Sequence, residues 1–310
     1  MKIVFFGTPY FAASILDYLL KHDVAVVAVV TQPDKKERSR KDKLTVKKYI
    51  KGCLKDIPLY QPVKASDESF VEELKKYDAD LFVIAAFGQL LKQNLLDVPK
   101  LDCINVHTSL LPKYRGASPI QHALLNGDKK TGVTIMKVIL KMDAGDIIDQ
   151  AVVDITDDMN KQELEEELIK KSGPLLLKVI DQYKKGSVDT VPQDDTLVTF
   201  APKLKPETFK IDWNKDAKDI HNLIRALAPF PSAYTDIVFE NGEKKQLKIV
   251  KSEVVDMHGQ IGEVVQRTKK SLIVGCGSNS LSLLKVQIEG KKEVDIVSFL
   301  NGIKSSFKLT

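Results

Sequence analysis

The sequence predicts an α/β protein in which a Rossmann-like, mostly parallel sheet domain is followed by a small C-terminal β-barrel (OB-like) domain. Two observations predict this class. Before about residue 190, short apolar runs alternate with helical patterns, which is typical of a parallel sheet covered by helices. Beyond it, short β-branched runs divided by Gly or Asn are typical of a small antiparallel barrel. We therefore expect a first domain over 1–189, a linker over 190–206 and a second domain over 207–310.

In the first domain, the apolar run 3–7 predicts a strand, and a helix follows with Thr8 as its N-cap and Pro9 at its first helical position. A long helical pattern at 164–186 should be interrupted or kinked near Gly173-Pro174, because proline removes a backbone donor and clashes with the preceding turn. The other expected strands are 24–31, 80–88, 103–109 and 131–139, with a short extended piece at 57–63, and the other expected helices are 67–79 and 118–127.

The second domain begins after a segment rich in proline and acids, 191–207, that predicts the linker. A helix is expected over 216–231, and proline ends it. The expected strands of the barrel are 234–240, 247–255, 259–268, 271–276 and 281–288.

Composition excludes several classes of protein. The hydrophobic fraction of 43% and charged fraction of 29% are ordinary for a globular chain. Three cysteines without a CxxC pair favour a reducing compartment and give no zinc-binding pattern. The longest apolar runs, 24–30 and 81–87, are too short to span a bilayer. We therefore expect a cytoplasmic, metal-free protein that does not enter membranes. We also expect a monomer, although composition does not determine the oligomeric state.

Positive charge is concentrated in one window of the chain. Residues 35–51 contain nine Lys or Arg and two acids, so this window carries 9 − 2 = +7, whereas the net charge of the chain is +5. Such a run is either a solvated loop or helix face, or an electrostatic arm that binds phosphates. Composition alone leaves both interpretations open.

The candidate site combines an amide, an imidazole and a carboxylate. Asn105 and His107 are two residues apart on a predicted strand, so their side chains leave the same face. Asp143 follows on a later loop, where a carboxylate can orient the imidazole and stabilise its charged form. This group of residues is suited to polarising a carbonyl.

Other interpretations of these residues are weaker. A metal site built from His107, His122 and Asp143 lacks the HxxxH or HExxH spacing. The turn at Gly7 lacks the further glycines of a dinucleotide-binding loop. Cys103 shares the strand face with His107 but lies about 13 Å along the chain from it, which disfavours a covalent mechanism. A lone strand histidine is otherwise most often a hydrogen-bonded core residue, and Asn105 and Asp143 argue against that here.

The stretches 105–135 (NVHTSLLPKYRGASPIQHALLNGDKKTGVTI) and 142–148 (MDAGDII) closely resemble the folate-dependent formyltransferases. The resemblance extends over nearly the full chain, whereas one-domain members of the family would end near residue 200. It is carried further by FFGTPYFAASIL, VVTQPD, VIAAFGQLL, LVTFAPKL, IDW and RALAPFP. The basic window departs from the family pattern, because it holds none of the glycines that commonly flank its Arg.

The resemblance implies formyl transfer from 10-formyltetrahydrofolate to the α-amino group of methionyl initiator tRNA, for translation initiation. Asn105 and His107 would stabilise the oxyanion, and Asp143 would hold His107 and assist proton movement. The residues that would contact folate are Phe87, Gly88, Ser109, Leu110, Leu111, Pro112, Ala144, Gly145 and Asp146. The residues that would contact tRNA are Arg38, Arg40, Lys41 and Lys43.

Three alternatives share this sequence pattern. A sugar-nucleotide N-formyltransferase would use the same core with a nucleotide pocket in place of a basic arm. A 10-formyltetrahydrofolate hydrolase would use water in place of the amine. A noncatalytic RNA-binding protein could retain the fold, but it would not need the amide, imidazole and carboxylate together.

Overall fold

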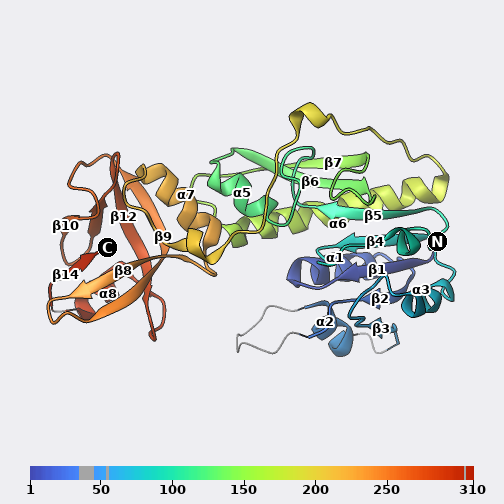
Figure 1. Cartoon of the computed structure of the whole chain (residues 1–310), viewed down its shortest axis with the longest axis horizontal. Coiled ribbons are helices and arrows are strands. Elements are labelled where there is room, and N and C mark those ends of the chain that lie inside the picture. Colours follow the sequence, from blue (N-terminus) through green and yellow to red (C-terminus); the bar gives the residue numbers. More distant parts are fainter. Residues whose placement is uncertain (35–44, 54–55, 304) are drawn as a thin grey trace. The chain divides into compact units, whose positions relative to one another are not determined.

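The computed structural model describes residues 1–34, 45–53, 56–303 and 305–310, and in its first half strands alternate with helices (Figure 1). The strands of this half are β1 (Ile3–Gly7), β2 (Val26–Val30), β3 (Leu59–Tyr60), β4 (Leu81–Ala85), β5 (Asp102–His107), β6 (Lys130–Lys137) and β7 (Ile147–Asp154). The helices are α1 (Tyr10–Lys21), α2 (Val46–Cys53), α3 (Glu68–Lys75), α4 (Gln93–Leu96), α5 (Pro119–Leu125) and α6 (Lys161–Lys185).

The strands of this half form one seven-stranded sheet in the order β3-β2-β1-β4-β5-β6-β7. Strands β1 to β5 are parallel where they pair, and β6 runs antiparallel to β5. The chain moves from β1 through β2 to the β3 edge and then returns to β4 on the other side of β1. In such a sheet the carboxyl ends of the strands on either side of this reversal are where ligands bind.

Buried aromatic and aliphatic side chains of the central strands form a core of this sheet. Phe6 packs against Phe82 and Phe87, with ring centroids 5.1 Å and 5.4 Å apart. Every residue of β1 and β4 is buried, as expected for strands covered on both faces. The carboxyl ends of β4 and β5 are therefore supported by this buried core.

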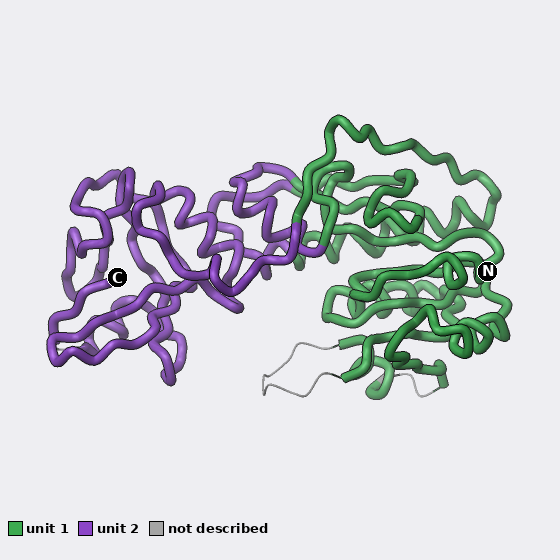
Figure 2. The backbone as a smooth tube through the Cα atoms, in the orientation of Figure 1, with its two compact units in different colours: residues 1–116, 131–153, 165–201 green, residues 117–130, 154–164, 202–310 purple. Residues whose placement is uncertain are grey.

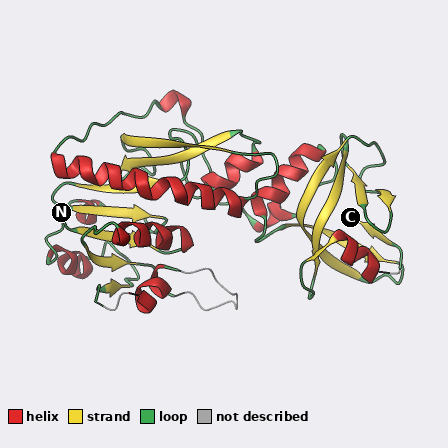
Figure 3. Cartoon of the chain, turned by 180° about the vertical axis from the view of Figure 1, so that it is seen from behind, coloured by secondary structure: helices red, strands yellow, loops and turns green. Residues whose placement is uncertain are grey.

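One local prediction is wrong, and a second is wrong in part. Pro9, not Thr8, is the N-cap of α1, with φ −78° and ψ −176°. The Thr8 hydroxyl donates instead to the Phe87 carbonyl at 3.2 Å, so a tertiary contact takes the side chain that was expected to cap the helix. The long helix is not interrupted, since α6 continues through Pro174 and is drawn as one helix in Figure 3, whereas a kink near Gly173-Pro174 stays a prediction. Gly173 lets α1 approach closely, because a Cβ there would lie 2.5 Å from the Tyr18 ring.

The second half forms another seven-stranded sheet, a nearly closed antiparallel barrel with the path β10-β11-β12-β9-β8-β14 and β13 paired to β12. The predicted fold class is confirmed. Its strands are β8 (Ala233–Phe239), β9 (Lys244–Val255), β10 (Val264–Arg267), β11 (Leu272–Gly275), β12 (Ser280–Ile288), β13 (Val294–Asp295) and β14 (Phe307–Leu309), with helices α7 (Ala217–Leu227) and α8 (Ile296–Gly302). Trp213 lies in the barrel core, and its indole N–H donates to the Thr235 hydroxyl at 3.1 Å.

Figure 2 colours two compact units that alternate along the chain. The first contains residues 1–116, 131–153 and 165–201, and the second contains residues 117–130, 154–164 and 202–310. The expected domain boundaries at 189 and 206 stay a prediction. Within the described part of the chain, no helix combines the length and apolar character needed to cross a membrane.

Candidate functional site

His107, the last residue of β5, is buried and has a polar neighbour at each of its two ring nitrogens. Its Nε2 lies 3.0 Å from the Tyr114 carbonyl oxygen, which only accepts, so Nε2 carries a hydrogen and donates. The other nitrogen, Nδ1, lies 3.7 Å from Asp143 Oδ1. This distance is too long for a hydrogen bond and short enough for an ion pair when the ring is charged. Nδ1 is therefore the nitrogen that can gain or lose a proton during a reaction.

Asp143 is fixed by a backbone donor on the loop after β5. The Gly116 N–H donates to Asp143 Oδ2 at 2.8 Å, which leaves Oδ1 turned toward His107. Asp143 has φ 51°, in the left-handed region that a non-glycine residue rarely adopts. Two residues on, a Cβ at Gly145 would lie 1.9 Å from the Lys137 carbonyl oxygen, so only glycine fits this return of the loop.

Asn105 lies between β4 and β6 at the centre of the site. It pairs with Ile84 on β4 and with Met136 on β6. Within the described residues no hydrogen bond occupies its half-buried carboxamide, and neither of its polar atoms is fully enclosed. The amide is therefore reachable and free to donate to a carbonyl oxygen.

The candidate nucleophile Cys103 belongs to the core and not to the site. It is buried in the cluster under the sheet, and its thiol contacts the Leu96 carbonyl oxygen at 3.6 Å. Burial raises the pKa of the Cys103 thiol, so the nucleophilic thiolate is disfavoured. Direct transfer without a covalent enzyme intermediate fits this environment.

The loop after β5 that was expected to contact folate is folded tightly on itself. The Ser109 hydroxyl donates to the Lys113 carbonyl at 2.6 Å, and Ser109 is fully buried. Leu111 is buried as well, with its N–H donating to the Thr134 hydroxyl at 3.1 Å and its peptide bond to Pro112 in the cis form. Leu110 and Pro112 are half-buried. The side chain of Ser109 therefore stabilises the fold of the loop. A ligand would contact the residues beside Ser109 and the loop backbone.

The other residues expected to contact folate lie on two loops. Phe87 packs its ring into the core, and its carbonyl accepts from Thr8 and from Gln32 Nε2, at 2.9 Å from the latter. Gly88 is exposed with φ 82°. On the Asp143 loop, Ala144 and Asp146 are half-buried and Gly145 is buried. These placements leave backbone groups and small side chains at the carboxyl ends of β4 and β6.

Sequence reasoning missed two residues of the site, Arg115 and Gln193. Gln193 Nε2 donates to the carbonyls of Asp143 and Gly145, at 2.9 Å and 2.7 Å. Arg115 is buried, and its Nε donates to Gln193 Oε1 at 2.9 Å. Arg115 lies in a stretch that carries the family resemblance, and Gln193 lies just before another such stretch. Neither residue type, however, predicts a hydrogen bond between positions 78 residues apart in the sequence.

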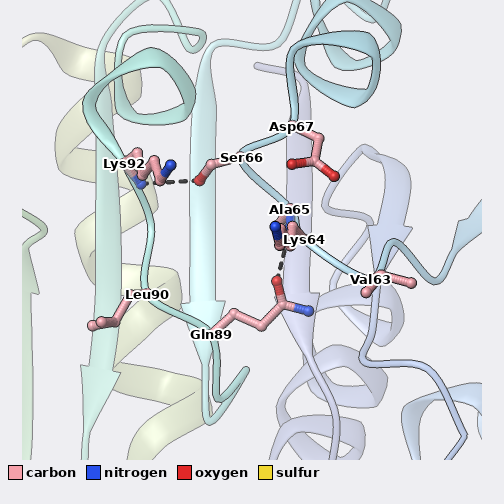
Figure 4. A pocket seen from close by; sticks show the side chains of 8 residues that line it. All are labelled: Val63, Lys64, Ala65, Ser66, Asp67, Gln89, Leu90 and Lys92. Atoms are coloured by element: carbon pink, nitrogen blue, oxygen red, sulfur yellow. Dashed lines mark hydrogen bonds between the residues drawn. The ribbon is translucent and has the colours of Figure 1, made fainter.

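A hollow of about 270 Å³ lies beside the loop after β4 but contains none of the expected site residues (Figure 4). Two hydrogen bonds join residues of its lining: Gln89 Oε1 accepts from the Ala65 N–H at 2.8 Å, and the Ser66 hydroxyl accepts from the Lys92 N–H at 3.0 Å. Among the residues that the structure describes, no group of three or more His, Cys, Asp or Glu could hold a metal ion. Arg38, Arg40, Lys41 and Lys43 lie outside the described residues.

Family models match the part of the chain that holds Asn105, His107 and Asp143, and the barrel as well. Residues 1–180 match the formyl transferase model, and residues 203–304 match the model of the formyl transferase C-terminal domain. The chain belongs to the formyl transferase family. It is 44% identical to the methionyl-tRNA formyltransferase of Protochlamydia amoebophila, covering 99% of this chain and 96% of that one. It is 42% identical to the methionyl-tRNA formyltransferase of Streptococcus thermophilus, covering 97% and 96%.

Solved structures of other proteins share this fold. The sugar 3N-formyl transferase WlaRD, crystallised with dTDP and 5-N-formyl-THF, has a TM-score of 0.67 at 21% identity, covering 94% of this chain and 99% of that one. HypX from Aquifex aeolicus, in complex with tetrahydrofolic acid, has a TM-score of 0.66 at 16% identity, covering 99% of this chain and 50% of that one. At these identities the likeness shows the shared fold alone.

Proposed function

We propose that this formyl transferase family member transfers the formyl group of 10-formyltetrahydrofolate to the α-amino group of methionyl initiator tRNA, in the cytoplasm, for translation initiation. The observation that carries the proposal is the reachable Asn105 carboxamide beside the His107–Asp143 pair at the end of β5. The names of relatives that match nearly the whole chain support methionyl-tRNA as the amine substrate.

The chemistry assigns one task to each side chain. The amine nitrogen attacks the formyl carbon, the bond from that carbon to N10 breaks, the amine loses a proton and N10 gains one. Asn105 donates to the formyl oxygen as negative charge develops on it. His107 Nδ1 acts in proton movement, and Asp143 stabilises the ring whenever it is charged. The half-buried position of the site strengthens these interactions, because water screens them less.

The folate donor would lie between the loop after β4 and the Asp143 loop. Exposed Gly88 and the half-buried Ala144 present little side-chain bulk there, so a flat ring could approach the backbone. The initiator tRNA would be held by the basic window and the C-terminal barrel, with Arg38, Arg40, Lys41 and Lys43 near phosphates. We keep the monomeric state as a prediction.

The test of this function is a formyl-transfer assay with 10-formyltetrahydrofolate and three acceptors in parallel. Methionyl initiator tRNA should become formylated, while an aminosugar nucleotide and water should react at background rates. Formylation of the aminosugar without formylation of methionyl-tRNA would assign the site to sugar-nucleotide chemistry. Release of formate with no acceptor required would assign it to hydrolysis.

The basic window should contribute to tRNA binding and not to folate binding. Replacing Arg38 and Arg40 with Ala should raise KM for methionyl-tRNA and reduce the salt slope of binding by about 1 for each phosphate that the variant no longer neutralises. A control that removes the same charge is Lys75→Ala with Lys170→Ala, because both lysines lie exposed in i,i+3 ion pairs on helices. An equal change in the salt slope for both double variants would contradict a specific role for the window.

A further inference from the structure

Gln193 and Arg115, which hydrogen bonds link to the Asp143 loop, have no part in the chemistry described above. Arg115 is 3% exposed, and its guanidinium also reaches Asp195 Oδ1 at 3.0 Å. We infer that Gln193, held by Arg115, is a positioning residue that keeps the Asp143 carboxylate within reach of His107. This inference rests on the proposed function, since it assigns Asp143 its catalytic task.

The orientation of the Gln193 amide is fixed by its partners. Its nitrogen faces two carbonyl oxygens, of Asp143 and Gly145, and both accept only. Its oxygen faces Arg115 Nε, which donates only. Reversal of the amide would place oxygen against two oxygens and nitrogen against a cation. Both the amide nitrogen and the amide oxygen of Gln193 are therefore used in hydrogen bonds at this position.

These hydrogen bonds act where the Asp143 loop is strained. The left-handed backbone of Asp143, at φ 51°, is less favourable than the ordinary regions for a residue with a side chain, so contacts that hold the loop there matter. Gln193 anchors the loop on both sides of Ala144, and the Gly116 N–H holds the carboxylate itself. Without the Gln193 contacts, the loop is free to relax and carry Oδ1 away from His107.

One short segment relates the two catalytic side chains. Tyr114 accepts from His107, and Gly116 donates to Asp143, while Arg115 between them holds Gln193. The segment is itself paired with residues beyond Gln193, because Arg115 N–H donates to the Thr199 carbonyl at 2.9 Å and its carbonyl accepts from Ala201 N–H at 2.8 Å. The segment 193–201 thus contacts the site through Gln193, Thr199 and Ala201.

The exposed ion pair of this network is not the part that matters. Asp195 is exposed, so its pairing with Arg115 is worth little because water competes for both groups. The contacts of Gln193 are made to a buried guanidinium and to the backbone of a half-buried loop. A small displacement of a catalytic group is enough to lower a rate by about a hundredfold.

The test uses Gln193→Glu, which keeps the side-chain size and the Arg115 contact but sets carboxylate oxygens against the two carbonyls. We expect kcat for formyl transfer to fall by about tenfold or more, with KM for both substrates within about twofold. The Gly116 amide proton, which is bonded to Asp143, should exchange faster with deuterium than in the parent protein. Gln93→Glu on α4, where the amide donates to exposed Asp97, is the control and should change neither quantity.

The decisive measurement combines this variant with Asp143→Asn. If Gln193 acts only through Asp143, the double variant should be no slower than Asp143→Asn alone. Losses of kcat that multiply, or unchanged Gly116 exchange in Gln193→Glu, would overturn the inference. A parent protein that forms no formyl-methionyl-tRNA would instead contradict the proposed function, and the exchange measurement would still decide the positioning role.

Discussion

Replacing Asp143 with Asn should lower kcat for formyl transfer by about 10²- to 10⁴-fold while both substrates still bind. Asn retains an oxygen that accepts from the Gly116 N–H, as Asp143 Oδ2 does at 2.8 Å. Its NH₂ group then faces His107 Nδ1, where it can donate to a neutral ring but repels a protonated one. The charged form of His107 loses its support, although the loop keeps its shape. Single-turnover rates with saturating substrates measure this loss directly.

The matched control is Asp149→Asn on β7, since half-buried Asp149 forms an ion pair with exposed Lys178 at 2.7 Å. It should leave kcat within about twofold, because an ion pair with an exposed partner contributes little. His107→Ala should fall in the same range as Asp143→Asn. If Asp143→Asn keeps its kcat while His107→Ala does not, the carboxylate has no share in the chemistry, and the site reduces to Asn105 and His107.

The central part of this site follows from the sequence because it depends on strand geometry. Alternation along β5 places Asn105 and His107 on one face, and the sheet register gives each a fixed neighbour on β6, Met136 for Asn105 and Thr134 for His107. The loop with Asp143 follows β6, the strand next to β5 in the sheet. A short loop is therefore enough to bring Asp143 close to His107. Local periodicity and one long motif are therefore enough to find these three residues.

The roles of Gln193 and Arg115 cannot be predicted from strand geometry or local periodicity. Gln193 lies in a stretch without apolar periodicity, which predicts a linker, and its contacts depend on side-chain hydrogen bonds that no spacing encodes. Thr8 shows the same limit in a helix cap, because a contact with Phe87 takes the hydroxyl that the local pattern assigns to the cap. Local rules fail where a tertiary partner competes for the same polar group.

The second compact unit holds a similar long-range contact around Arg225 on α7. This side chain is 3% exposed, and it donates hydrogen bonds to backbone and amide oxygens. Its guanidinium donates to the backbone carbonyls of Thr156 at 3.1 Å, Met159 at 3.3 Å and Leu124 at 3.4 Å, and to the Asn222 side chain at 3.0 Å. Arg225 thus ties α7 to the end of α5 and to the chain before α6, which explains why these stretches share one unit.

Arg225→Met should lower the free energy of unfolding of the second unit by about 3–5 kcal/mol, because it leaves several buried acceptors unpaired. The fluorescence of Trp213, the single tryptophan of the chain, reports this unit selectively, since the indole lies in the barrel core. Arg267→Met is the matched control: exposed Arg267 also donates to backbone carbonyls, of Ile303 and Ser305, but water can replace it. Arg267→Met should lower the free energy of unfolding by about 1 kcal/mol. Equal shifts of the urea midpoint for the two variants would show that burial of the Arg225 contacts adds nothing to stability.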